Sequence, residues 1–331
     1  MDKIAVVILN WNGVGLLEQF LAAIVQYSGE ATIYVADNAS TDDSLLFVRE
    51  NFPSVRIIEN KSNLGFAGGY NAALKQVDAE IYALVNSDVE VTENWLGPMV
   101  EMFEKEPNTA IIQPKILDYK KKEYFEYAGA AGGFIDKYGY PFCRGRLFDT
   151  LEKDIGQYDD SCEIFWASGA CFFIRSKVYW ELNGFDAGFF AHQEEIDLCW
   201  RAINREYMIK YNSQSVVYHV GGATLAQGSS RKTFLNFRNS LSMLVKNLPK
   251  SQVVPVVLTR LALDGLAGIQ FISKGKFSHC FAIVKAHFSF YGKFVRNYKA
   301  RDSKQLGQYY KTKSVVYRYF VKNGRVFEKL I

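Results

Sequence analysis

The stretch that decides the fold is Ala83-Leu-Val-Asn-Ser-Asp-Val-Glu-Val91. An apolar run over residues 81–85 predicts a buried strand, which stops at Asn86-Ser87-Asp88 before the extended pattern resumes. A carboxylate at the carboxyl end of a parallel strand lies where open α/β sheets bind ligands, and it suits a hard divalent cation that carries a phosphate. A strand followed by an Asx turn would have the same letters, so the flanking sequence has to decide.

Strand and helix patterns alternate on both sides of this stretch. Further apolar runs predict strands at residues 4–9, 31–36, 55–59 and 110–116. Helical patterns between them cover residues 16–24, 43–51, 71–76 and 93–106, and Ser40 or Thr41 is expected to cap the second of these helices. Such alternation implies βαβ units and a mostly parallel central sheet flanked by helices, an α/β fold.

Polar side chains follow three of the predicted strands. Asn10 and Asn12 follow the first, Asp37 the second and Asp88 the fourth. The crossover rules bring these strand ends to one edge of the sheet. There Asp37 could accept a hydrogen bond from the imide N–H of a nucleobase, or it could cap a turn. The nearby glycines 65, 68 and 69 would let the backbone approach a ligand closely.

The middle of the chain carries two further candidate regions. Residues 120–158 are irregular and predict either a flexible loop or a small extra sheet. Residues 164–174 read as a strand that is interrupted by Ala167-Ser168-Gly169-Ala170. Small residues between aromatic ones suit the floor of a sugar-binding groove, although a tight bulge explains them as well.

Three carboxylates and a histidine complete the candidate chemistry. Glu194, Glu195 and Asp197 begin a predicted helix just after an aromatic segment. Carboxylates close to one another and to apolar rings should have a raised pKa, as a general base requires, while an acidic helix start is the structural alternative. His219 ends a predicted strand, where it could bind a metal, contact a diphosphate or serve the fold.

The last third of the chain differs from the rest in charge. Residues 230–331 hold 20 basic and 3 acidic side chains, whereas the other 229 residues hold 19 basic and 32 acidic ones. We therefore divide the chain into an enzyme domain at 1–229 and a basic, aromatic-rich helical region at 230–331. Residues 231–247 predict an amphipathic helix. Residues 253–271 predict a packed or interfacial helix, because Arg260 and Asp264 interrupt an otherwise apolar run.

This basic region predicts the kind of surface that the chain contacts. Phe and Tyr alternate with Lys and Arg over residues 290–299, which suits an anionic lipid headgroup layer, although a solvated cap on the domain would look similar. Nucleic acid is not expected as a partner, because no RNA-binding signature accompanies the pattern. The N-terminus reads as a first strand and not a signal peptide, and the five cysteines read as reduced thiols of a cytoplasmic protein.

Taken together, these blocks resemble the family 2 glycosyltransferases, and more narrowly the bacterial branch with rhamnosyltransferases and galactofuranosyltransferases. The resemblance covers about residues 3–240 and is specific because the blocks occur in combination and in order. They are Val7-Ile-Leu-Asn-Trp-Asn12, Val35-Ala-Asp-Asn-Ala-Ser-Thr-Asp42, Asn63-Leu-Gly-Phe-Ala-Gly-Gly-Tyr-Asn71, Leu84-Val-Asn-Ser-Asp-Val-Glu90, Ser168-Gly-Ala-Cys171, Gly184-Phe-Asp186, and Phe189 through Arg201.

The resemblance implies the GT-A nucleotide-sugar-binding fold and an inverting reaction that depends on Mg²⁺ or Mn²⁺. Asp37 occupies the position for base recognition, and Asn86-Ser-Asp88 replaces the family's Asp-x-Asp, so that Asp88 is the expected metal ligand and Asn86 lowers the charge of the site. Glu195 falls on the catalytic base, where Asp is usual. His219 falls near a histidine that ligates the metal in related galactofuranosyltransferases.

The expected site follows from both lines of reasoning. Donor binding is placed on Asn10, Asn12, Asp37, Asn38, Asn63, Gly65, Gly69, Asn71, Asn86 and Ser87. Acceptor binding is placed on Trp166, Ser168, Gly169 and Glu194, catalysis on Glu195, and metal binding on Asp88 and His219.

The resemblance also suggests substrates and a location. dTDP-rhamnose is the first candidate donor and a lipid-linked saccharide in cell-surface polysaccharide synthesis the expected acceptor, with the enzyme peripheral on the cytoplasmic face of the membrane. A UDP-hexose or UDP-galactofuranose transferase is the alternative enzyme, and a non-catalytic nucleotide-sugar-binding scaffold is the alternative of another class.

Overall fold

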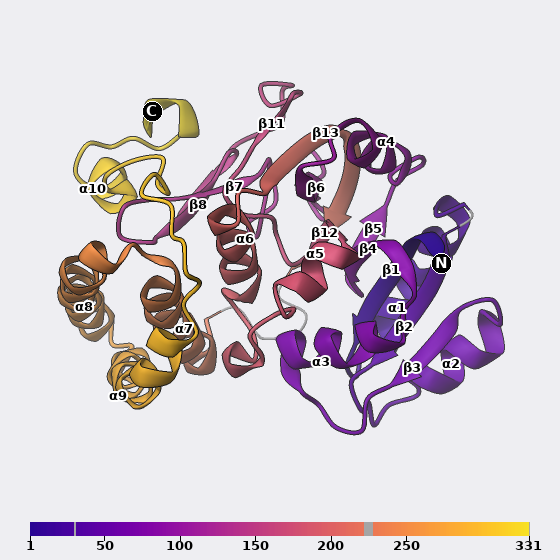
Figure 1. The fold of residues 1–331 in the computed structure, drawn as a ribbon, viewed down its shortest axis with the longest axis horizontal. Helices are drawn as coiled ribbons and strands as arrows, with labels where there is room; N and C mark the ends of the chain where they lie inside the picture. Colours follow the sequence, from indigo (N-terminus) through magenta and orange to yellow (C-terminus); the bar gives the residue numbers. More distant parts are fainter. Residues whose placement is uncertain (30, 222–227, 331) are drawn as a thin grey trace.

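Strands and helices alternate along the first half of the chain in the computed structural model, which describes residues 1–29, 31–221 and 228–330 (Figure 1). The elements of this half are β1 (Asp2–Asn10), α1 (Val14–Tyr27), β2 (Thr32–Asp37), α2 (Ser44–Asn51), β3 (Arg56–Glu59), α3 (Gly65–Ala73), the 3-10 turn η1 (Leu74–Gln76), β4 (Ala79–Asn86), β5 (Val89–Val91), α4 (Gly97–Lys105) and β6 (Thr109–Asp118).

The second half adds strands that widen the sheet and helices that cover one end of it. Its elements are β7 (Gly133–Ile135), β8 (Pro141–Cys143), β9 (Arg146–Leu147), β10 (Thr150–Leu151), β11 (Ser161–Glu163), β12 (Cys171–Arg175), α5 (Ser176–Glu181), η2 (Ala187–Phe189), α6 (Glu194–Asn204), β13 (Met208–His219), α7 (Ser230–Asn247), α8 (Lys250–Ser273), α9 (Phe277–Lys299), α10 (Val315–Phe320) and η3 (Phe327–Leu330).

The central sheet has the strand order β11-β13-β6-β12-β4-β1-β2-β3, and β5 pairs with β13. The half formed by β3, β2, β1 and β4 is parallel, as the alternation predicted, and β13 also runs parallel to β6. Strands β12, β11 and β5 pair antiparallel with their neighbours. In register, Asn10 lies opposite Asp37 and Leu9 lies opposite Asn86, so the polar strand ends meet at one edge.

Strands β1, β2 and β4 are apolar through their central residues because both faces of the sheet are covered there. Val6 and Ile8 of β1 pack into one core with α1 and α4, whereas Ala5 and Val7 pack into a second core with α3 and α6. The alternation follows from the two-residue period of a strand. Two cores of this kind hold the sheet edge rigidly, which is what a binding site built on strand ends requires.

Local differences from the sequence predictions have simple causes. Neither Ser40 nor Thr41 caps α2, so that expectation was wrong: Asp42 accepts hydrogen bonds from the Ser44 backbone N–H and hydroxyl (3.2 and 2.6 Å). Helix α3 begins at Gly65, six residues before the predicted start, because the small residues of this segment can pack as a helix against the sheet. Residues 133–151 form the small antiparallel sheet β10-β9-β8-β7, one of the two predicted alternatives.

Helices α7, α8 and α9 lie together at the end of the molecule opposite β3 and α2 (Figure 1). Leu241, Leu244 and Leu248 on and just after α7 are fully buried and belong to the same core as α6. The chain then returns to the small sheet, where Phe327 packs against Phe134 and Phe142. The domain boundary at residue 229/230 stays a prediction.

Candidate active site

Hydrogen bonds join the carboxyl end of β1 and the loop after it to the end of β2 and its loop. The Asp37 carboxylate, only 1% exposed, accepts from Asn10 Nδ2 (3.1 Å), from the Ser40 hydroxyl (2.5 Å) and from the Ser40 backbone N–H (2.8 Å). Asn12 lies with φ of 51° and its side-chain oxygen accepts from the Thr41 N–H (2.7 Å). Both Asp37 oxygens therefore bond within these two loops, so base recognition by Asp37 stays a prediction. Ser40 belongs to this region as well, although the sequence analysis gave it only a capping role.

Asparagines hold the neighbouring loop in place. Asn38 donates to Asn63 Oδ1 (3.1 Å) and to the Gly65 carbonyl (3.0 Å), and its own oxygen accepts from the Leu64 N–H (3.2 Å). Gly65 has φ of 70°, and a Cβ there would lie 2.5 Å from the Phe190 carbonyl oxygen. A Cβ on Gly69 would lie 3.0 Å from the Asn38 side chain. The two glycines are thus required by close packing.

Asn71 is used to join two parts of the fold. Its side-chain nitrogen donates to the Phe185 carbonyl (2.8 Å), and its oxygen accepts from the Tyr179 hydroxyl (2.6 Å) and the Phe185 N–H (3.0 Å). Both the nitrogen and the oxygen of the Asn71 side chain take part in these bonds, so Asn71 positions the segment before α6.

The end of β4 lies between the loop after β1 and the small-residue segment at 167–170. A Cβ on Gly13 would lie 3.6 Å from Ser87 Oγ, and the Asn86 backbone N–H donates to the Ala170 carbonyl (2.9 Å). Asn86 and Ser87 are both partly exposed at this edge. The structure therefore brings these two predicted donor residues to the junction of the donor and acceptor regions.

Asp88 and His219 lie side by side, although 131 positions separate them. Pairing of β5 with β13 and of Val220 N–H with the Asp88 carbonyl (3.0 Å) brings His219 Nε2 to 3.2 Å from Asp88 Oδ1. Two ligands that hold one cation at about 2.1 Å and at right angles lie about 3 Å apart. A carboxylate oxygen and an imidazole nitrogen at this separation therefore fit neighbouring positions around one divalent cation.

Glu126 supports this pair, and sequence reasoning missed it. Its Oε1 lies 3.3 Å from His219 Nδ1, and its Oε2 accepts from the Ala128 N–H. Burial disfavours a charged imidazole, but Glu126 and Asp88 outweigh it and raise the pKa of His219 to about 10, so the imidazole has to release its proton when a cation binds. Burial likewise opposes ionisation of Asp88, but His219 lowers its pKa. A carboxylate on the far ring nitrogen orients a metal-binding histidine in many proteins. Glu126 lies in the irregular 120–158 segment, where no motif marked it.

The segment before α6 has an unusual backbone. Phe190, His192 and Gln193 have φ of 67°, 70° and 73°, in the region that side-chain-bearing residues rarely adopt. Asn239 of α7 holds this segment, because its side-chain nitrogen donates to the carbonyls of Phe189 (3.0 Å), Ala191 (3.0 Å) and His192 (2.7 Å). Strained backbone of this kind persists where tertiary contacts impose it, and it is frequent at functional sites.

Glu194 and Glu195 open α6 directly after this strained segment. Burial raises the pKa of Glu194, and the adjacent Glu195 raises it further. Burial raises the pKa of Glu195 to about 7, although backbone N–H groups of the first turn oppose the shift. Each carboxylate has one oxygen, Oε2, without a hydrogen-bond partner among the described residues. A half-buried carboxylate that titrates near neutral pH has the properties of a general base.

Asp197 has a different task from its two neighbours. It is fully buried and binds Arg201 Nε (2.8 Å), Lys246 Nζ (2.8 Å) and Asn247 Nδ2 (2.9 Å). Burial opposes ionisation, but Lys246 and Arg201 lower the pKa of Asp197. This carboxylate therefore fastens α6 to α7 and leaves the reaction chemistry to the glutamates.

The predicted acceptor residues separate into two groups. Trp166 is 3% exposed, its ring lies against Gly133 and its indole N–H donates to the Phe134 carbonyl (2.9 Å), so it supports the small sheet. Ser168 is buried, with its N–H bonded to Gln113 Oε1 (2.8 Å). Gly169 is partly exposed beside Phe66 of α3. Of these three residues, Gly169 is the one in a position to contact an acceptor.

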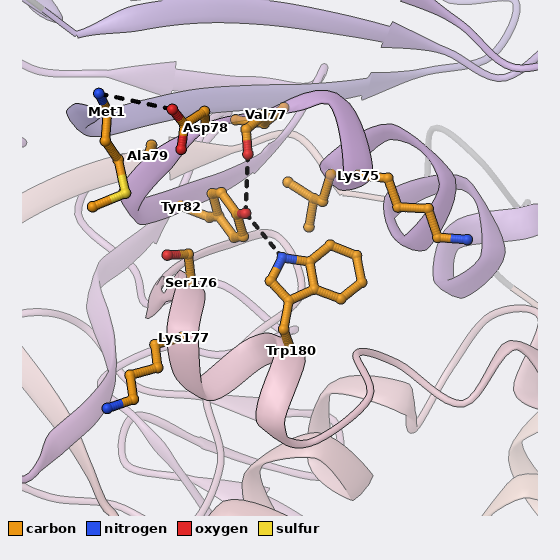
Figure 2. Close-up of a pocket in the computed structure, with 10 residues that line it drawn as sticks. Met1, Lys75, Val77, Asp78, Ala79, Tyr82, Ser176, Lys177 and Trp180 are labelled. Carbon is orange, nitrogen blue, oxygen red and sulfur yellow. Dashed lines mark hydrogen bonds and ion pairs between the residues drawn. The ribbon is translucent and has the colours of Figure 1, made fainter.

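An open pocket lies at the opposite edge of the sheet, beside the amino ends of β1 and β4 (Figure 2). Its lining includes Tyr82, whose hydroxyl accepts from the Trp180 indole (3.0 Å) and donates to the Val77 carbonyl (3.1 Å). Ligands of open α/β sheets bind at the carboxyl ends of the strands. The candidate active site is therefore the edge that carries Asp37 and Asp88, and catalysis by Glu195 of α6 stays a prediction.

Comparison with known proteins identifies the family of the chain. The family model for glycosyl transferase family 2 matches residues 5–182, which is more than half of the chain. The chain therefore belongs to glycosyl transferase family 2, and it is a glycosyltransferase.

Particular relatives and structures are more distant. The chain is 22% identical over 233 residues to an N-acetylglucosaminyl-diphospho-decaprenol L-rhamnosyltransferase of Mycobacterium tuberculosis, covering 66% of this chain and 76% of that protein. It is 24% identical over 264 residues to the low-salt glycan biosynthesis hexosyltransferase Agl10 of Haloferax volcanii, covering 76% and 80%. The mannosyltransferase PcManGT from Pyrobaculum calidifontis, solved with GDP-Man and Mn²⁺, superposes with a TM-score of 0.53 at 13% identity and 87% coverage of each chain. The fold is thus the expected GT-A fold.

Proposed function

We propose that this glycosyltransferase moves a sugar from a nucleoside-diphosphate donor to a lipid-linked saccharide, with inversion at the anomeric carbon and with the help of Mg²⁺ or Mn²⁺. The observation that carries the proposal is Glu195, a half-buried carboxylate with a raised pKa. The segment before it packs against the donor region, since the Ala67 N–H donates to the Phe190 carbonyl (3.3 Å). A base beside a donor site is the arrangement that direct displacement needs.

In the proposed reaction Glu195 takes the proton from the acceptor hydroxyl. That oxygen forms a bond to the anomeric carbon from the face opposite the leaving group, while the bond from this carbon to the diphosphate oxygen breaks. The electron pair departs with the nucleoside diphosphate. Asp88 and His219 would hold the divalent cation, which supplies positive charge to the departing diphosphate. Glu126 keeps the His219 ring in place for that role.

Glu194 and Glu195 are given different roles because their surroundings differ. Glu194 is 4% exposed and lies beside two other carboxylates, so its pKa is raised well above the ordinary value, and its protonated form can donate a hydrogen bond to the acceptor. Glu195 is less buried and titrates near pH 7. Two neighbouring carboxyl groups with separated pKa values allow one to act as donor and the other as base.

The names of the relatives suggest which substrates to test first. The M. tuberculosis relative is named as an L-rhamnosyltransferase that acts on a diphospho-decaprenol-linked sugar. We accordingly propose dTDP-rhamnose as donor, a lipid-linked saccharide of cell-surface polysaccharide synthesis as acceptor, and a peripheral position on the cytoplasmic face of the membrane. UDP-hexose and UDP-galactofuranose are the alternative donors, because thymine and uracil offer the same imide edge to Asp37.

The test is donor turnover across a panel of nucleotide sugars, with Mg²⁺, Mn²⁺ or EDTA, for the wild type and for Asp88→Ala. We expect one donor to be turned over only with metal and the variant to lose about a hundredfold or more of that rate. Asp78→Ala is the matched control, since Asp78 is exposed at the opposite edge of the sheet, and it should keep the wild-type rate.

Other outcomes would decide against the proposal. Equal turnover in EDTA would remove the metal from the mechanism. Metal-dependent binding of a nucleotide sugar without turnover, even with a lipid-linked acceptor present, would instead support a nucleotide-sugar-binding scaffold.

A further inference from the structure

After its first residue, Lys250, helix α8 has its charged residues inside and apolar residues outside. Leu258, Leu266 and Ile269 are 61%, 62% and 63% exposed. Arg260 and Asp264 are 3% and 0% exposed and pair with each other (3.2 Å). A surface helix of a water-soluble domain normally shows the reverse pattern. The outer face of α8 therefore requires a non-aqueous or protein neighbour.

Helix α9 continues this face with a regular stripe. Seven of its eight large exposed apolar residues recur at alternating spacings of four and three, which places them on one side of a helix. They are Phe277, Phe281, Val284, Phe288, Tyr291, Val295 and Tyr298. The opposite side of the helix, with Ala282, Ile283 and Ala286, is buried. The stripe is thus the side of α9 that stays exposed after the opposite side has packed against its neighbours.

The outer faces of α8 and α9, defined by the residues above and here called the apolar face, are surrounded by positive charge. Residues 250–301 contain nine Lys or Arg and one acidic residue, Asp264. Arg260 and Asp264 are buried as a pair, and Lys293 and Arg296 contact the segment before α6. The exposed lysines are Lys250, Lys274, Lys276, Lys285 and Lys299. Lys274 and Lys276 lie in the turn between the helices, and Lys285 is exposed beside the stripe. Two copies of this face would bring like charges together, whereas an anionic layer would neutralise them.

We propose that the apolar face docks on an anionic lipid bilayer, with α8 and α9 lying along the surface. The Phe and Tyr rings enter the boundary between headgroups and acyl chains, and the lysines contact lipid phosphates. By length and composition α8 is also apolar enough to cross a membrane. Arg260, however, holds α8 against the small sheet through the Tyr138 carbonyl (3.0 Å) and His287 of α9 lies 3.2 Å from Asp264, so the helix is fastened sideways to the enzyme.

Docking of this kind would orient the active site. The other side of α9 reaches the segment before the catalytic glutamates, because Lys293 Nζ donates to the Gly188 carbonyl (3.2 Å) and Arg296 pairs with Asp186. Burial opposes ionisation of Asp186, but Lys246 and Arg296 depress its pKa strongly. One helix therefore touches both the proposed membrane and residues 186–188 before α6, which would give a saccharide carried on a lipid a short path to the proposed site.

The test is co-sedimentation of the full chain with vesicles, without donor or acceptor. Vesicles of equal parts phosphatidylglycerol and phosphatidylcholine are compared with pure phosphatidylcholine. We expect the double variant Phe281→Ser and Phe288→Ser to bind the anionic vesicles about tenfold or more weakly than the wild type. The control is Leu46→Ser with Ile155→Ser, which removes two apolar side chains that are 53% and 79% exposed elsewhere and should bind as the wild type does.

Each alternative result overturns the proposal. Unchanged vesicle binding by the Phe281 and Phe288 variant would exclude the apolar face as the docking surface, and equal binding to neutral vesicles would exclude the anionic partner. A dimer that this variant dissociates, with no vesicle binding by the wild type, would assign the face to a second copy of the chain. Because binding is measured without substrates, this result is independent of the proposed reaction, and donor turnover by the variant should stay at the wild-type rate.

Discussion

Two parts of the candidate site are held in contrasting ways. They are the loops at the strand ends, which are proposed to bind the donor and are called the donor edge, and residues 186–193, which are proposed to lie beside the acceptor and are called the acceptor segment. At the donor edge, side chains between Asn10 and Asn63 bond one another across at most 30 positions of sequence, as Asn10 does with Ser40 (3.2 Å). The acceptor segment at residues 186–193 is held from α7 and α9, through contacts such as Asn239 to His192 and Arg296 to Asp186 that span 47 and 110 positions. Most of these hydrogen bonds at the donor edge join residues of the edge to one another, whereas the acceptor segment is held by bonds from the basic C-terminal helices.

The donor edge and the acceptor segment also differ in how much backbone strain they carry. Asn12 and Ala39 at the donor edge adopt positive φ, but their loops are short and bonded within themselves. In the acceptor segment three of the last four residues, Phe190, His192 and Gln193, do so. Strain of about 1–3 kcal/mol at each residue has to be offset elsewhere. We interpret the buried bonds from Asn239 and Arg238 as that compensation.

The largest expected effect is that of Glu195→Gln, which removes the proposed base without changing its size. We expect a loss of about a thousandfold in the rate of sugar transfer, with donor binding unchanged, because proton abstraction disappears. In the wild type kcat/KM should rise with pH up to about 7 and then level off, since only the ionised Glu195 can accept a proton. Measured pH profiles of both proteins check this, and a variant that keeps full transfer would refute the role of Glu195.

Asn239→Ala and Asn38→Ala compare the two regions directly. Asn239→Ala removes three bonds to the acceptor segment, and we expect kcat to fall about a hundredfold while donor affinity stays within twofold. Asn38→Ala removes the corresponding bonds of the donor loop and should mainly weaken donor binding. Steady-state kinetics and donor titrations distinguish the two. If Asn239→Ala weakens donor binding as much as Asn38→Ala does, the separation of the regions is wrong.

The smallest expected effect is the change in thermal stability caused by Glu195→Gln. Burial raises the pKa of Glu195 from an ordinary 4.5 to about 7, so the folded state binds a proton that the unfolded state releases. The stabilisation is complete below pH 4.5 and is lost as pH rises through 7, a change of about 1–3 kcal/mol. Glu195→Gln removes this loss, so its Tm should exceed that of the wild type by about 2–6 °C at pH 8 and match it near pH 5.

Only the difference between the two proteins is informative in this experiment. Asp186 and Asp197 have lowered pKa values and therefore stabilise the fold with the opposite pH dependence, which both proteins share. Thermal unfolding of both proteins across this pH range measures the difference. A difference in Tm that does not grow between pH 5 and pH 8 would show that ionisation of Glu195 does not destabilise the folded state.

Some features of the site could be predicted because they depend on neighbouring residues in the sequence. The continuous apolar runs around Val7 and Val85 indicated strands buried on both faces, and the polar residues after them indicated one shared edge. The adjacent Glu194 and Glu195, which follow an aromatic segment, predicted raised pKa values, and burial is the largest cause of both shifts. Such inferences succeed because strand periodicity acts over a few residues and apolar neighbours in the sequence predict burial.

Tertiary structure alone decided the rest. Glu126 reaches His219 only because the irregular 120–158 segment folds beside β13, and Asn239 reaches His192 only because α7 packs against α6. Trp166 looked like an acceptor contact, but the close approach of Gly133 turned it into a support for the small sheet. The sequence by itself determined the strand ends, the carboxylates and the basic, aromatic tail. Which distant side chains meet them was decided by packing, because such contacts leave no local pattern.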